Sequence, residues 1–293
     1  MGKFDITFIG HMCYDEIKPY TGGATIAPGS AVLCGAMAAA RVGKKVAVIT
    51  KMSPKDAHIL EPMKEIGIKT FLIPAPETTY MKVIHLTNNV DEREIFQSKN
   101  AGYFSFAEIP AFQSKHVHLA GITDQEFTLD FIIDMKNAGY NLSVDMQSFV
   151  RQVNSKTGNI SMSDVPEKLE LLRYFDKVKL DVVEAKMLTK RSEILKSAQT
   201  FIDWGSPEIV ITQANGVLAR ANGSTCYKRF TNRSNRGRTG RGDTTFAGYL
   251  SWRMEHGLEE STAFAAALAS IKMETPGPFA GTLEDVQKRM KKL

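Results

Sequence analysis

Apolar positions along the chain alternate between two periodicities, and this alternation predicts an α/β protein. Residues 5–10 form a short apolar run that ends at Gly10, which is typical of a buried strand. Residues 30–43 follow with a capping serine, strong helix-forming residues and a terminal glycine, and residues 45–50 have the pattern of the next strand. Strand, helix and strand in this order favour a parallel sheet.

The same alternation returns in the second half of the chain. Helices are predicted at residues 127–139 and near 166–175, between strands at residues 116–122, 141–146, 177–180 and 208–213. Residues 217–230 have the pattern of a hairpin with its turn at Asn222 and Gly223, and helices are predicted from Thr244 onward. The sequence therefore predicts a single α/β domain over residues 1–293, with a mostly parallel central sheet flanked by helices.

Two segments depart from this pattern. Residues 15–28 and 78–99 alternate polar and apolar side chains, as strands with one face in solvent do. Although the two segments are far apart in sequence, they can pair as a small β-sheet over the main one. We expect them to form a lid from segments at about residues 12–28 and 78–100, and such a lid can also serve as the interface of a homodimer.

Composition and charge narrow the class of protein. Hydrophobic residues make up 43% of the chain and charged residues 24%, which excludes a disordered or fibrous protein. The mild net charge of +5 favours anionic small molecules over nucleic acid as partners. The three cysteines lie too far apart for a disulfide framework or a C-x-x-C metal site, and no apolar run has the length of a signal sequence or a membrane span. We therefore expect a cytoplasmic protein that does not enter a membrane.

The densest candidate chemistry lies in the stretch NRGRTGRGDTTFAGYL, residues 235–250. A glycine-rich turn that enters a helix gathers backbone N–H groups and the positive end of the helix dipole, and this combination attracts phosphate. Asp243 repels phosphate, so its position suits a base that takes a proton from a hydroxyl attacking phosphorus. An aspartate that only caps the helix explains the same residue. The glycines alone do not decide between these two interpretations.

Two motifs carry a resemblance to a known family. TGRGDTTFAGYL resembles the C-terminal signature of the ribokinase-like (PfkB) carbohydrate kinase family, and PGSAVLCGAMAAARVGKKVAVITKMSPKD is similar to its N-terminal signature. The motifs stand in the family's order, and the resemblance covers essentially the whole chain. It implies a ribokinase-like fold and an enzyme that uses ATP and Mg²⁺ to phosphorylate a hydroxyl of a sugar, cyclitol or similar polyol.

The resemblance also implies roles for individual residues. Asp243 matches the catalytic base, and the anion hole that stabilises the transferred phosphoryl group matches Gly240, Arg241 and Gly242. Contacts with the acceptor are implied for Asp15, Gly29, Cys34 and Arg151. The nucleotide and its magnesium are expected near Asp181, Glu184, Thr212, Gly216 and Gly277, with Glu184 supporting the metal through water.

Several positions differ from the family's usual pattern. Asp181 stands where asparagine is usual, which adds charge near the metal but keeps oxygen ligands. Arg241 replaces a small residue, and Gly237 takes the place of an aspartate, which weakens any monovalent-cation site nearby. Cys13 and Cys34 fall where asparagines are frequent, so hydrogen-bonding capacity is lost and ribose is a less favoured acceptor.

Two alternative functions are compatible with the sequence. A nucleoside kinase of the same family needs an aromatic shelf for a base, which Tyr14, Tyr20 and Tyr80 can supply. A non-catalytic nucleic-acid or regulatory binding protein would use the basic run at residues 228–241. Binding of a polyphosphate explains the same charges, so we expect no nucleic-acid partner.

Two further groups of polar residues stand at predicted strands. Asp145, Gln147 and Arg151 follow a strand end, where open α/β sheets bind ligands, although capping by Asp145 explains the pattern nearly as well. His116 and His118 share one face of a strand with no third ligand near them in sequence. They fit ordinary strand histidines better than a zinc site.

Overall fold

The computed structural model describes residues 2–88 and 92–293. Within these residues a central sheet has the strand order β15-β14-β13-β12-β9-β8-β1-β4-β5. Its strands are β1 (Phe4–Ile9), β4 (Val46–Met52), β5 (Lys69–Pro74), β8 (Ser114–Leu119), β9 (Leu142–Asp145), β12 (Lys177–Asp181), β13 (Glu208–Thr212), β14 (Gly216–Ala221) and β15 (Ser224–Arg229). Pairing is parallel from β5 to β13, whereas β14 pairs antiparallel with both β13 and β15. The predicted α/β fold with a mostly parallel sheet is confirmed.

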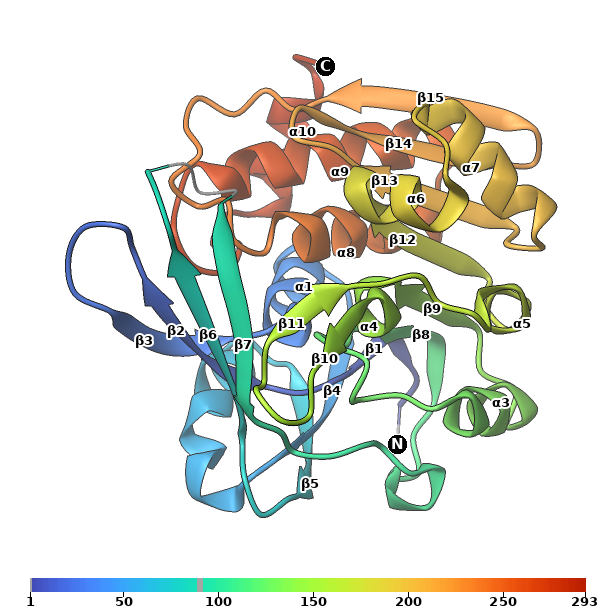
Figure 1. Cartoon of the computed structure of the whole chain (residues 1–293). Coiled ribbons are helices and arrows are strands. Elements are labelled where there is room, and N and C mark those ends of the chain that lie inside the picture. Colours follow the sequence, from blue (N-terminus) through green and yellow to red (C-terminus); the bar gives the residue numbers. More distant parts are fainter. Residues whose placement is uncertain (1, 89–91) are drawn as a thin grey trace.

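Helices cover both faces of this sheet (Figure 1). One face carries α1 (Ala31–Arg41), α2 (Glu61–Glu65), α8 (Arg241–Arg253), α9 (Leu258–Met273) and α10 (Leu283–Met290). The other carries α3 (Leu129–Asn137), α5 (Lys168–Leu172), α6 (Val182–Thr189) and α7 (Ile194–Asp203). Because side chains alternate along a strand, Phe8 packs into the first core and Ile9 into the second. Shorter helical turns are η1 (Pro54–Leu60), η2 (Phe106–Glu108) and α4 (Gln147–Val150).

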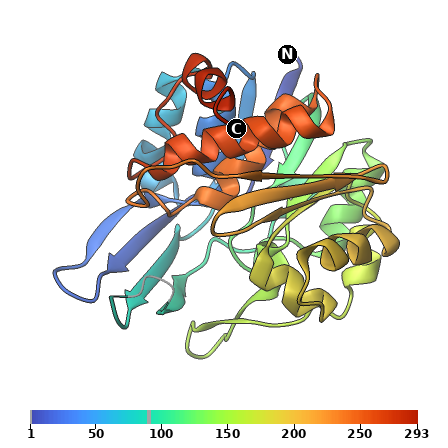
Figure 2. The same ribbon diagram turned by 90° about the horizontal axis from the view of Figure 1, so that it is seen from above.

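A second, four-stranded sheet projects from one side of the molecule (Figures 1 and 2). Its order is β3-β2-β6-β7, with β2 (Cys13–Lys18), β3 (Thr25–Gly29), β6 (Thr79–His85) and β7 (Arg93–Lys99). The predicted pairing of the two non-adjacent segments is confirmed, because β2 lies parallel to β6. Residues 89–91 of the expected lid segment lie outside the described residues. A short ribbon of β10 (Arg151–Val153) and β11 (Ile160–Met162) follows α4.

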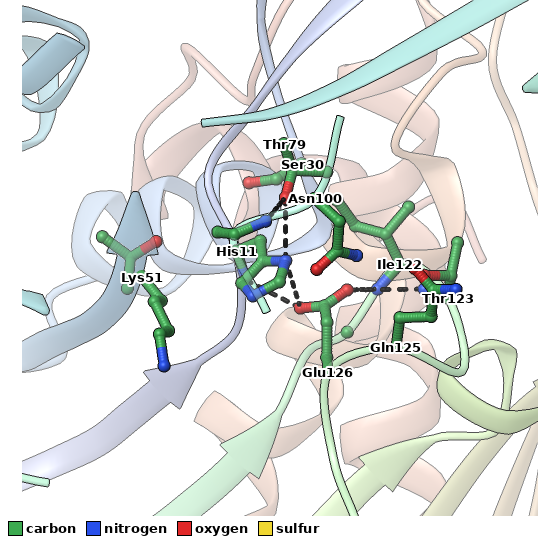
Figure 3. A network of polar contacts seen from close by, with 12 residues as sticks. His11, Ser30, Lys51, Thr79, Asn100, Ile122, Thr123, Gln125 and Glu126 are labelled. Atoms are coloured by element: carbon green, nitrogen blue, oxygen red, sulfur yellow. Dashed lines mark hydrogen bonds and ion pairs between the residues drawn. The ribbon is translucent and has the colours of Figure 1, made fainter. Parts of the chain in front are cut away.

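A buried hydrogen-bond network joins the small sheet to the body (Figure 3). His11 follows β1, and its Nδ1 lies 2.9 Å from the Thr79 hydroxyl of β6, while its Nε2 lies 2.9 Å from the Gly102 carbonyl. The Glu126 carboxylate accepts the His11 backbone N–H at 2.8 Å and also the N–H groups of Ile122 and Thr123. Burial lowers the pKa of the His11 imidazole, so the ring is neutral and Nε2 donates to the carbonyl.

Some element boundaries differ from the sequence predictions. The helix predicted near residues 166–175 covers only Lys168–Leu172, because the Asp176 N–H already bonds to the Leu142 carbonyl at the start of β12. The last group of helices begins at Arg241 rather than at Thr244. Strand β5 and helices α6 and α7 were not predicted. No helix in the described part of the chain combines the length and apolarity that crossing a membrane requires.

Candidate active site

The strand order brings several of the predicted site residues to one edge of the central sheet, where the parallel strands end. From β1 the sheet extends to β4 and β5 on one side and to β8, β9, β12 and β13 on the other. In open α/β sheets, ligands bind where the strand order changes direction, just outside the carboxyl ends of the strands. Asp145, Asp181 and Thr212 end three of these strands, and α8 begins beside them, since a Cβ on Gly242 would lie 2.8 Å from Lys179 Nζ.

The glycine turn begins α8 in a conformation that only glycine adopts without strain. Gly240 is the N-cap residue with φ 77°, and a Cβ on it would lie 2.4 Å from Cys34 Sγ. Arg241, Gly242 and Asp243 form the first turn, whose N–H groups have no partner within the helix. Asp243 is therefore not the N-cap, and the interpretation of this residue as a helix cap is wrong.

Asp15 and Asp243 lie close enough for their charges to interact, and both charges also act on Cys34. Asp15 lies on β2, where the Cys13 thiol donates to its Oδ1 at 3.4 Å, and Gly29 permits its approach because a Cβ there would lie 1.9 Å from Asp15 Oδ2. Burial raises the pKa of the Asp15 carboxyl, the Cys13 hydrogen bond opposes this, and the charge of Asp243 raises the pKa further. Burial and Asp243 also raise the pKa of the Cys34 thiol to about 12, so this thiol is neutral.

A buried lysine that sequence reasoning missed lies under the glycine turn. Lys179 of β12 pairs with Asp145 of β9 at 2.6 Å, and both side chains are almost fully buried. Although burial lowers the pKa of Lys179, the charges of Asp145, Glu184 and Asp243 raise it above the ordinary value. The signal in the sequence was a lysine at an apolar position of the strand KVKLD. Asp145, singled out from the sequence, thus serves mainly as the partner of this cation.

Asp181 and Glu184 form a reciprocal capping box at the start of α6. Asp181 Oδ1 accepts the N–H groups of Val183 and Glu184 at 2.8 Å each, and Glu184 Oε2 accepts the Asp181 N–H at 2.8 Å. Burial, with the Asp181 charge second, raises the pKa of the Glu184 carboxyl to about 8. The second oxygens of both carboxylates suit magnesium, which prefers oxygen and keeps several waters. Within residues 2–88 and 92–293 no three His, Cys, Asp or Glu side chains gather as a metal site.

The residues expected at the nucleotide lie at the end of β13, at the start of β14 and after α9. Thr212 ends β13 and donates its hydroxyl to the Leu180 carbonyl at 3.3 Å. Gly216 permits close pairing of β14 with β15, because a Cβ there would lie 2.5 Å from both the Lys228 carbonyl oxygen and the Tyr227 hydroxyl. Arg241 reaches this region, with Nη1 3.5 Å from the Ala214 carbonyl. Gly277 follows α9 with φ 86° in open space.

Other predicted residues have different surroundings. The positive charge of Arg151 lowers the pKa of Glu184, which puts Arg151 on the side of the Asp181 and Glu184 carboxylates. The Gln147 side chain donates to the Gly121 carbonyl at 2.8 Å. His118 is buried beside Phe246 and Ser143, and burial lowers its pKa to about 3.

Two surface cavities lie away from this site. One of about 620 Å³ is lined by residues 70–74 of β5 with Glu108 and Pro110. Another of about 250 Å³ lies between α9 and α10. Neither cavity is lined by residues of the glycine turn.

The fold of this chain is ribokinase-like, the fold of a class of small-molecule kinases. A family model described as pfkB family carbohydrate kinase matches residues 4–285, and the chain belongs to this family. It is accordingly a phosphotransferase, which transfers a phosphoryl group to an alcohol group of a sugar or cyclitol. Kinases of this family use a phosphoryl donor together with a divalent metal. The family favours an enzyme over the alternative of a non-catalytic nucleic-acid binder.

Solved structures add more detailed likenesses. One is a pyrophosphate-dependent kinase in the ribokinase family complexed with a pyrophosphate analog and myo-inositol, 31% identical, covering 97% of this chain and 99% of that chain with a TM-score of 0.88. A sulfate complex of a pyrophosphate-dependent kinase in the ribokinase family is also 31% identical, covering 96% and 99% with a TM-score of 0.89. Ribokinase of Arabidopsis thaliana, complexed with ribose and ATP, is 16% identical, covers 99% of both chains and has a TM-score of 0.76, which shows the fold alone. None of the curated proteins matches this chain.

Proposed function

We propose that this protein transfers a phosphoryl group from inorganic pyrophosphate to a hydroxyl of a cyclitol such as myo-inositol. The observation that carries the choice of donor is the charge of the glycine turn, where Arg236, Arg238 and Arg241 lie within six residues at the start of α8. Pyrophosphate has no nucleoside to bind, so its affinity comes from cations and N–H groups, and arginine matches phosphate oxygens best. The pyrophosphate-dependent kinases that this chain resembles support the choice over the ATP indicated by the signatures.

The chemistry follows from the groups around the turn. Asp243 takes the proton from the acceptor hydroxyl while the oxygen of that hydroxyl forms a bond to the terminal phosphorus. The bond from that phosphorus to the bridging oxygen breaks, and orthophosphate leaves with the electron pair. The amides of Gly240 and Gly242 and the guanidinium of Arg241 stabilise the charge on the transferred group, while the Arg241 N–H donates to the Arg238 carbonyl at 3.1 Å. Bound magnesium would neutralise phosphate charge, and Asp181 and Glu184 would hold it through water.

The acceptor side favours a ring with adjacent hydroxyl groups. Asp15 presents a carboxylate that can accept from two hydroxyls at once, while Cys13 and Cys34 offer neutral thiols in place of amides. We assign Gly29 to letting Asp15 approach, and Arg151 to the donor phosphates as well as to the acceptor, because its charge reaches Glu184.

The tyrosines offered for a nucleoside kinase do not face this side. Tyr14 is next to Asp15 on β2, so its side chain points to the opposite face of the small sheet, and Tyr80 is its partner on β6. Their hydroxyls bond to Asp56 and Glu16 instead. Tyr20 is 56% exposed in the loop after β2. The acceptor is therefore a polyol rather than a nucleoside.

We assign the small sheet the role of a lid. It carries Asp15 toward Asp243, and its closure would exclude water, since hydrolysis of the donor is the competing reaction. A homodimer through this sheet stays a prediction, for which the 61% exposure of Ile26 on β3 provides an apolar contact. Sedimentation of the purified protein tests it.

The proposed function is tested by offering the purified protein Mg²⁺ with pyrophosphate or ATP, and inositols, hexoses, pentoses or nucleosides as acceptors. We expect a phosphate monoester, detected by phosphorus NMR, from pyrophosphate and myo-inositol. A product formed with ATP but not with pyrophosphate would contradict the donor, and a product formed only from nucleosides would contradict the acceptor.

Asp243→Asn tests the catalytic base. We expect kcat to fall by about 10²–10⁴-fold, the usual contribution of a positioned base, with pyrophosphate affinity retained in calorimetry. Asp130→Asn is the matched control, since Asp130 lies in the first turn of α3 and is exposed. An Asp243→Asn enzyme with the wild-type rate would show that another group takes the proton.

A further inference from the structure

A buried ammonium holds the glycine turn from behind. Lys272 of α9 is only 2% exposed, and its Nζ donates hydrogen bonds to the backbone carbonyls of Gly237 and Thr239. The same turn is packed against the end of α9, because the Gly237 N–H bonds to the Met273 carbonyl at 2.8 Å and a Cβ on Gly237 would lie 1.9 Å from the Thr275 carbonyl oxygen. Sequence reasoning did not single out Lys272.

The hydrogen bond to Thr239 fixes the direction of a catalytic amide. In a planar trans peptide the C=O and the N–H point in opposite directions. When the Thr239 carbonyl points at Lys272, the N–H of Gly240 points away from it, toward the start of α8. No acceptor within residues 2–88 and 92–293 takes this N–H, which leaves it available for a phosphate oxygen.

Gly237 stands where the family pattern has an aspartate, and the structure shows what this exchange does. A free monovalent cation would need oxygen ligands at this place, but Gly237 offers no carboxylate, and its carbonyl and that of Thr239 accept from an ammonium. The residues present therefore do not fit a free potassium ion. They fit a cation that belongs to the chain.

We propose that Lys272 is a positioning residue whose ammonium acts as a built-in cation, orienting the anion-hole amides and making the reaction independent of free monovalent cations. This inference rests on the proposed role of residues 240–242 as the anion hole. Burial lowers the pKa of Lys272, whereas the neighbouring Cys34 and then Asp243 raise it in part.

The test compares initial rates in tetramethylammonium chloride and in potassium chloride at equal ionic strength, with whichever donor and acceptor the wild-type protein uses. We expect wild-type protein to have the same rate in both salts. Lys272→Ala removes the ammonium and leaves space for a small cation. We expect its kcat to fall in tetramethylammonium chloride by about 10²–10³-fold, the usual cost of losing an anion-hole donor. Potassium, ammonium or methylammonium should restore much of this loss.

Lys51→Ala is the matched control. Lys51 also donates to a backbone carbonyl, that of Tyr103 at 2.9 Å, and its side chain is largely buried, but it lies away from the glycine turn. We expect this variant to show no dependence on the cation. If Lys272→Ala does not fold by circular dichroism, Lys272→Met keeps the volume and should be slow without rescue.

Three results would overturn the inference. They are a wild-type enzyme that requires potassium, a Lys272→Ala or Lys272→Met enzyme with the wild-type rate, and a folded Lys272→Ala enzyme whose lost activity no cation restores. These results differ from a failure of the proposed function. In that case wild-type protein shows no turnover with pyrophosphate, or Asp243→Asn remains active, whatever the state of Lys272.

Discussion

Ser30 has a backbone conformation that glycine would adopt more easily. Its φ is 142°, in a region that residues with a Cβ rarely occupy. The serine has a use there, because its hydroxyl accepts the Leu33 N–H at 3.0 Å and caps α1. The chain thus keeps a strained residue between Gly29 and the helix that carries Cys34.

Ser30→Gly should stabilise the protein. Relief of strain at such a residue amounts to about 1–3 kcal/mol, while exchange of a serine cap for glycine costs only about a few tenths of a kcal/mol. We expect a higher midpoint of urea unfolding. Thr128→Gly is the control, because Thr128 caps α3 with an ordinary φ of −95° and its loss should lower the midpoint. A lower midpoint for Ser30→Gly would mean that the strain at this residue is small.

Helix α6 shows how one element combines a structural and a chemical task. In its capping box, backbone N–H groups donate to one oxygen of Asp181 and to one oxygen of Glu184. The helix follows β12, which pairs with β13. Because Glu184 is buried, its carboxyl favours the protonated form, and a cation nearby would favour release of the proton.

Glu184→Gln should change the pH dependence of stability. The folded carboxyl has its pKa raised to about 8, whereas the unfolded one titrates near 4.5, so between these values the folded state binds the additional proton. The free energy of unfolding therefore falls as pH rises through this window. Urea midpoints can be measured at intervals from about pH 5 to about pH 8, the window that linkage sets. They should decline less with rising pH in Glu184→Gln than in wild-type protein.

Glu170→Gln is the control for this measurement, since Glu170 is also the third residue of a helix but is exposed. Its midpoints should decline with pH as those of the wild-type protein do. Parallel declines for Glu184→Gln and wild-type protein would show that Glu184 titrates at an ordinary pKa.

At the scale of the whole molecule, side-chain hydrogen bonds attach the small sheet to the body at several places. His11, Thr79 and Glu126 form one buried part of this attachment (Figure 3). Thr79 also accepts the Ala101 N–H at 3.1 Å. A single hydroxyl therefore connects the end of β1, the start of β6 and the segment that follows β7.

Thr79→Val should loosen the small sheet. It leaves His11 Nδ1 and the Ala101 N–H buried without a partner, at a cost of about 1–3 kcal/mol for an unsatisfied group. We expect faster hydrogen exchange in β2 and β6 and unchanged exchange in β12. Thr70→Val, at a half-buried threonine of β5, is the matched control. Unchanged exchange in β2 and β6 would show that other contacts hold the small sheet.

The sequence alone determined the features that depend on short stretches of chain. Apolar periodicity predicted the α/β fold, and the Asn222-Gly223 turn is present with φ of 50° and 74°. The glycine turn with Asp243 was predicted because the phosphate-binding geometry of a helix N-terminus is local. The two strand-rich segments were predicted to pair, and they do.

Only the tertiary structure decided which distant residues meet. Lys179 and Lys272 lie 93 positions apart, yet both lie against the glycine turn, and neither belongs to a signature motif. The role of a buried lysine depends on its partners, and those partners come from β9 and from the turn before α8. Periodicity reports which face of an element is apolar, but long-range packing decides which charges that face brings together.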